Sequence, residues 1–152
     1  MNLLNRSTKM LLAVLLLTLS ATAYAQDQNG PVCSNSSLKG AFGFQIVGTN
    51  NFFGAFAFNG RFVADGKGNL TAGTGTESIA GDVVSGVPFV GTYTVTADCL
   101  GTATIVFIRS DNNQQAHLDF TLVNDGQGIL FISSDQQATE TGTAQLIGKR
   151  HD

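Results

Sequence analysis

The sequence predicts an all-β protein built as an eight-stranded antiparallel up-and-down barrel, with a β-sandwich as the alternative. Three observations lead to this prediction. Short Asp-x-x-Gly segments recur at 65–68, 98–101 and 125–128, each between two runs of alternating apolar and polar residues. From residue 39 onward no stretch keeps a helical period. Glycines interrupt several of the alternating runs, as the bulges and coiling of small closed barrels require.

Each Asp-x-x-Gly segment is typical of a tight β-hairpin turn. The aspartate accepts hydrogen bonds from backbone N–H groups, and we expect the glycine at the fourth position to take the positive φ of a bulge. These turns connect the second strand to the third, the fourth to the fifth and the sixth to the seventh. In an up-and-down meander the three turns therefore lie at one end of the molecule.

The expected strands follow one another from residue 40 to residue 147. They cover 40–47, 52–64, 69–79, 88–97, 102–109, 116–124, 129–134 and 139–147. One helical turn is expected at 34–38, and looser polar connections are expected at 48–51, 80–87, 110–115 and 135–138. Closure of the eighth strand on the first removes exposed edges. An immunoglobulin-like sandwich would need Greek-key crossovers and a buried tryptophan, and the chain has no tryptophan.

Two cysteines, Cys33 and Cys99, are expected to form a disulfide. Cys33 precedes the first strand and Cys99 lies inside an Asp-x-x-Gly turn, so both fall at the end that carries the tight turns. A disulfide that closes a loop of roughly 66 residues contributes about 2–4 kcal/mol to the free energy of unfolding.

The N-terminus has the pattern of a secretory signal peptide. Arg6 and Lys9 precede an apolar run at 10–19, and a small-residue cleavage site ends at Ala25. The run is too short to span a bilayer. The expected organisation is a signal peptide at 1–25, a lead-in at 26–39 tied by the disulfide and a barrel domain at 40–150. We therefore expect a secreted protein, periplasmic or extracellular, without a membrane span.

Composition argues against several classes of partner. After cleavage the chain has six basic and eleven acidic side chains, so its net charge is negative. Nucleic acid and anionic membranes are therefore poor partners. Each Asp-Gly turn offers a single carboxylate, which is too few for calcium, and no glycine-rich turn leads into a helix that could hold a nucleotide. His117 and Asp119 share the polar face of one expected strand, where they meet solvent. We expect no catalytic residues, no metal and no cofactor.

A candidate ligand mouth lies at the end opposite the tight turns. Arg109 and Glu140 each lie an even number of residues from apolar residues on the same strand, so they have the same parity and would face inward if those residues do. They could then pair at the mouth. The alternative is that both lie on the rim and meet water. Phe89 and Phe107 would supply apolar lining. Glu77 has the parity of Thr71 and Gly73 and is expected to face outward. The sequence does not decide between a hollow and a filled barrel, although we favour a filled one.

Three segments carry a resemblance to a known family. The segments 33–44, 60–70 and 91–99 resemble a largely uncharacterised family of small secreted bacterial proteins. In shape the chain is also similar to calycins and allene-oxide-cyclase-like barrels. The family resemblance implies a secreted β-barrel and brings no known activity with it.

Three hypotheses about function remain, and we favour a protein that is not an enzyme. The first is a secreted, non-catalytic barrel that binds a small apolar ligand at the end opposite the Asp-x-x-Gly turns. The second is a structural or adhesive module that meets an extracellular partner through its polar connections at 80–87 and 110–115. The third is a barrel isomerase similar to allene oxide cyclases, with Glu140 as its carboxylate.

Overall fold

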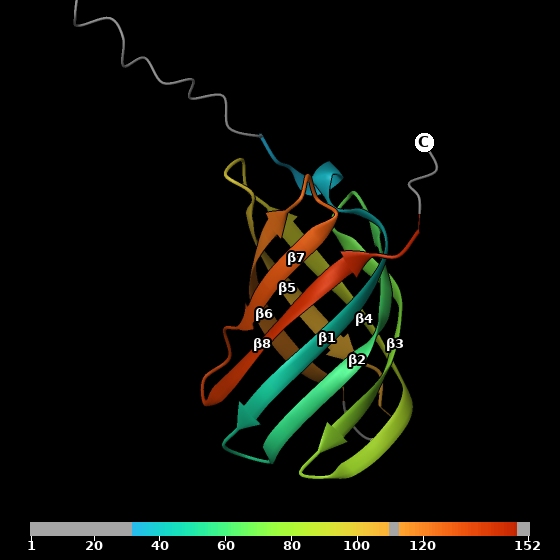
Figure 1. Ribbon diagram of the computed structural model, residues 1–152, viewed down its shortest axis with the longest axis vertical. Coiled ribbons are helices and arrows are strands. Elements are labelled where there is room, and N and C mark those ends of the chain that lie inside the picture. The colour runs from blue at the N-terminus through green and yellow to red at the C-terminus, as the bar shows by residue number, and fades with distance from the viewer. Residues whose placement is uncertain (1–31, 110–112, 149–152) are drawn as a thin grey trace, which may run out of the picture. The chain divides into compact units, whose positions relative to one another are not determined.

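The computed structural model describes residues 32–109 and 113–148, which form the predicted closed, eight-stranded antiparallel barrel (Figure 1). Every strand pairs with the next one along the chain, and β8 closes the barrel against β1. The strands are β1 (Lys39–Asn50), β2 (Gly54–Asp65), β3 (Asn69–Ile79), β4 (Asp82–Val95), β5 (Leu100–Phe107), β6 (Gln114–Val123), β7 (Gly128–Ser133) and β8 (Ala138–Leu146). The expected signal peptide lies outside the described residues. Within them, no helix has the length and apolar character needed to cross a membrane.

The three Asp-x-x-Gly turns lie where the sequence predicted them, at the end of the barrel that is uppermost in Figure 1. In the first turn Asp65 Oδ1 accepts hydrogen bonds from the backbone N–H of Lys67 at 2.7 Å and of Asn69 at 3.0 Å, and Gly68 has a φ of 111°. This turn has the predicted chemistry.

The other two turns depart from that prediction, because positive φ does not fall on their fourth residue. It falls on Cys99 in the second turn and on three successive residues, Asn124 to Gly126, in the third. Gly101 and Gly128 instead lie within β5 and at the start of β7. A Cβ at Gly101 would clash with the Phe120 ring, so this glycine is needed for close packing.

The expected polar connection at 80–87 is also wrong. Ala80 and Gly81, with φ of 50° and 99°, form a two-residue turn, and β4 begins directly afterwards with Asp82 paired to Ile79. Positive φ at both central residues is the geometry of the hairpin turn that best matches strand twist. The β3–β4 hairpin is therefore longer than the sequence predicted.

The tight-turn end is closed by the lead-in segment. The helical turn η1 (Asn35–Ser37) precedes Leu38, which is buried beneath the barrel. The Tyr93 hydroxyl donates to the backbone oxygen of Leu38 at 2.7 Å, and the predicted disulfide joins Cys33 to Cys99 with a Cα–Cα distance of 5.0 Å. A hydrogen bond and the disulfide thus fix the lead-in segment across this end of the barrel, where it closes the interior.

Phenylalanine rings inside the barrel lie against glycines on the neighbouring strand. In three cases the two residues are direct cross-strand partners, and a Cβ on the glycine would clash with a ring carbon. The pairs are Phe89 with Gly73, Phe120 with Gly101 and Phe131 with Gly142. A ring that lies over a glycine stays close to the wall, and this leaves room along the barrel axis.

Candidate functional site: a phenylalanine-lined cavity

The barrel encloses a cavity of about 590 Å³ that opens at the end opposite the Asp-x-x-Gly turns. Leu38, Leu70 and Tyr93 form its floor at the tight-turn end. Asn50 and Glu140 lie at its mouth. The interior is therefore hollow rather than filled, contrary to the interpretation that we favoured from the sequence.

The wall is dominated by five phenylalanines on four strands. Neighbouring ring centroids in this group lie 5.1–6.3 Å apart. The group comprises Phe44, Phe56, Phe58, Phe89 and Phe107. The structure thus places both aromatic residues expected at the mouth, Phe89 and Phe107, in the cavity wall. The edge-to-face and tilted geometries that these rings adopt are the favourable ones for aromatic pairs.

An ion pair is built into this aromatic wall. Arg109 Nη2 donates to Glu77 Oε1 at 2.7 Å and to Oε2 at 2.8 Å. The Glu77 side chain is 2% exposed and that of Arg109 is 28% exposed. The guanidinium carbon also lies 5.9 Å from the centroid of the Phe107 ring. The positive charge of Arg109 is therefore compensated within the wall.

The outward orientation predicted for Glu77 is wrong because β3 contains a bulge. Between Leu70 and Gly73 the register shifts by one residue relative to β4, and Ala72 has a φ of 50°. One extra residue reverses the alternation, so Thr71 points outward while Gly73 and Glu77 face the interior. Gly73 is one of the glycines that indicate a bulge in the sequence, but it does not show which residue is the extra one, so parity counted along the chain indicated the wrong face.

Glu140 lines the mouth as its parity indicated, but Arg109 pairs with Glu77 and not with Glu140. Burial raises the pKa of the Glu140 carboxyl. A hydrogen bond from the Asn50 side chain opposes this rise, and the nearby charge of Asp135 adds to it. The carboxyl group is thus held in a partly apolar position that disfavours its charge.

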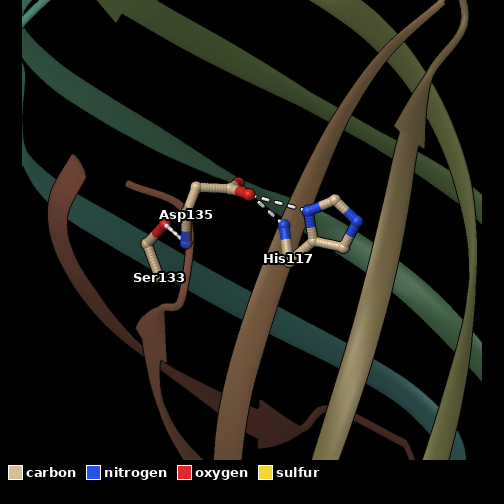
Figure 2. Close-up of polar contacts among 3 residues, drawn as sticks. All are labelled: His117, Ser133 and Asp135. Carbon is tan, nitrogen blue, oxygen red and sulfur yellow. Dashed lines mark hydrogen bonds and ion pairs between the residues drawn. The ribbon is translucent and has the colours of Figure 1, made fainter. Parts of the chain in front are cut away.

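A histidine–carboxylate pair lies at the same rim (Figure 2). His117 Nδ1 lies 2.7 Å from Asp135 Oδ1, and the His117 backbone N–H donates to Asp135 Oδ2 at 2.9 Å. The backbone N–H of Asp135 donates to Ser133 Oγ at 3.4 Å. Ser133 therefore contacts Asp135 and not the imidazole, so the three residues do not form a catalytic triad.

The role that the geometry supports for this pair is structural. The His117 side chain is 51% exposed, and its partner lies in the segment that connects β7 to β8. The sequence indicated only that His117 shares a solvent-facing strand face with Asp119; its partner in the structure, Asp135, was not predicted. Among residues 32–109 and 113–148, no cluster of three or more histidine, cysteine or acidic side chains could hold a metal.

Comparisons of the chain with family models, with curated proteins and with solved structures find no match in any of the three.

Proposed function

We propose that this protein is a secreted, non-catalytic β-barrel that binds one small, largely apolar molecule in its lumen. The observation that supports the proposal is the phenylalanine-lined cavity of about 590 Å³. Its volume falls within the range typical of small-molecule sites. An apolar body placed there would displace water from aromatic surface, which is the main favourable contribution to such binding.

Secretion is part of the same proposal. It is supported by the signal-peptide pattern at 1–25, by the Cys33–Cys99 disulfide and by the resemblance of three segments to small secreted bacterial proteins. The disulfide ties the lead-in to the end that carries the tight turns. In this proposal the ligand enters at the opposite end, where the cavity opens.

The test is a cavity-filling substitution with a matched control. Ala116 lines the cavity on β6, and Ala57 is exposed on the outside of β2. The native protein should bind naphthalenemethanol, a neutral aromatic probe, in calorimetry and should be stabilised against heat by it. Ala116→Phe should abolish both effects, whereas Ala57→Phe adds the same group outside and should preserve them.

Two results would contradict the proposal. One is a native protein that neither binds nor is stabilised by any member of a panel of neutral aromatic and aliphatic probes. The other is binding that Ala116→Phe leaves unchanged, because the probe would then occupy another surface.

A barrel isomerase is the second candidate, and Glu140 is the observation that favours it. A carboxyl at the mouth of an apolar cavity, with a raised pKa, has the properties of a general acid or base. If the protein is an isomerase, a bound compound should be recovered with unchanged mass and altered chromatographic retention. Glu140→Gln should stop this conversion while binding persists.

For the adhesive hypothesis, residues 82–87, expected to belong to a polar connection, are instead part of β4.

A further inference from the structure

The cavity lining carries more negative than positive groups. Three carboxyl groups and one guanidinium group contribute to the lining: Glu77, Asp135, Glu140 and Arg109. Arg109 and Glu77 neutralise each other at 2.7 Å. Two carboxylates, Asp135 and Glu140, then remain on the opposite side of the lumen, on β8 and in the turn before it.

These two carboxylates differ in how they are compensated. Asp135 forms hydrogen bonds with the His117 imidazole and with its backbone N–H, and both groups lie toward the outside of the rim. Glu140 takes a neutral hydrogen bond from Asn50. Among the residues that the structure describes, no basic side chain lies within ion-pair distance of Glu140. A partly buried carboxylate without a cation is costly, and a ligand that brings a cation relieves this cost.

We propose that the ligand is a cationic amphiphile, with an aromatic or otherwise apolar body in the phenylalanine-lined lumen and a protonated amine that pairs with Glu140 at the mouth. This inference rests on the proposed function. The faces of the lumen rings favour a nearby cation as well. An anionic head group would instead meet two carboxylates and an arginine whose charge is already compensated.

The pairing makes binding dependent on pH. The groups that face Glu140 are Asn50 on β1, Asp135 with His117 behind it, and the Arg109–Glu77 pair across the lumen. Burial raises the pKa of Glu140, so this carboxylate takes up a proton at a higher pH than an exposed glutamate. Binding of the amine should therefore weaken as the pH falls from neutral, while the amine itself stays protonated.

The experiment compares three probes that share one ring system and differ in the charge of the head group: naphthylmethylamine, naphthalenemethanol and naphthoate. At neutral pH we expect calorimetry on the oxidised protein to show the amine binding about tenfold more tightly than the alcohol, a difference of about 1.4 kcal/mol. The carboxylate should bind most weakly.

Two variants locate the effect. Glu140→Gln keeps the shape of the side chain and removes its charge, so the advantage of the amine and its loss in acid should both disappear while binding of the alcohol is retained. Asp119→Asn removes a carboxylate from the outer face of β6, and it should change none of the three affinities.

The outcomes separate this inference from the function on which it rests. If the alcohol binds in the cavity and the amine binds no more tightly, or if Glu140→Gln keeps the preference for the amine, the cationic ligand is refuted and cavity binding stands. If no probe binds, the proposed function fails. Tighter binding of the carboxylate would reverse the assigned charge of the ligand.

Discussion

Breaking the ion pair in the cavity wall should destabilise the barrel by different amounts according to which partner is removed. Arg109→Met leaves the Glu77 carboxylate 2% exposed and without its cation, whereas Glu77→Gln leaves a guanidinium that is already 28% exposed. Removal of one partner from a fully buried pair costs about 3–5 kcal/mol. Arg109→Met leaves the fully buried carboxylate unpaired, but the pair as a whole is only partly buried because Arg109 is 28% exposed. The loss in the free energy of unfolding should therefore approach the lower end of that range, about 3 kcal/mol.

Glu77→Gln should cost less, for two reasons. Water can reach part of the Arg109 side chain, and the glutamine carbonyl oxygen still accepts a hydrogen bond from Nη2. The loss is then that of a charge-assisted bond replaced by a neutral one, about 1 kcal/mol. The double variant Glu77→Leu, Arg109→Met leaves no buried charge, and it should recover most of the stability lost in Arg109→Met.

Heat or urea unfolding of the oxidised protein, followed by far-ultraviolet circular dichroism at neutral pH, measures these differences. For a domain of this size, the expected losses correspond to a fall in Tm of about 10 °C for Arg109→Met and about 3 °C for Glu77→Gln. Equal losses in the two single variants, or a larger loss in Glu77→Gln, would refute the argument that desolvation of Glu77 sets the cost.

Three other predictions concern the frame of the barrel. Replacing Cys33 and Cys99 by alanine should lower the free energy of unfolding by about 2–4 kcal/mol, and reduction of the native protein should lower it equally in urea titrations. Hydrogen bonds from the Asn69 side chain and from backbone amides lower the pKa of Asp65 to about 2. Relative to Asp65→Ala, the native protein should therefore keep its full advantage in Tm above the normal aspartate pKa and lose it as the pH falls through about 2. Gly142→Ala places a Cβ against a phenylalanine ring and a backbone oxygen, so it should cost about 2–3 kcal/mol in the same assay.

The strand order and the two unlike ends of the barrel could be predicted because they depend on local chemistry. The side chain of Asp65 accepts backbone N–H groups and stabilises the first turn as predicted. The other two Asp-x-x-Gly segments also form tight connections, although with different backbone geometry. Because the three turns occur at alternate connections of a meander, they lie at one end of the barrel. The Cys33–Cys99 disulfide agrees with this placement and confirms the predicted pairing.

The orientation of Glu77 could not be predicted, because it depends on contacts across the sheet. The bulge between Leu70 and Gly73 places Gly73 opposite Phe89, where the aromatic ring requires a residue without a side chain. That requirement comes from β4. Gly73 indicates that a bulge can occur in β3, but it does not show where the extra residue lies. No bulge interrupts β8, so the alternation of residues along it is regular. The inward orientation predicted for Glu140 from this alternation agrees with its position in the cavity lining.

The hollow interior and the open mouth are connected by energetics. A sealed, empty void of about 590 Å³ would cost on the order of 14 kcal/mol at the penalty measured for engineered cavities. A small domain has a total stability of about 5–15 kcal/mol, so a sealed void of this size would cost as much as the whole stability of the domain or more. The lumen must therefore exchange with solvent through its mouth or hold a ligand. Water against phenylalanine faces is the less favourable occupant, and an apolar ligand that displaces it stabilises the fold through the same contacts that bind it.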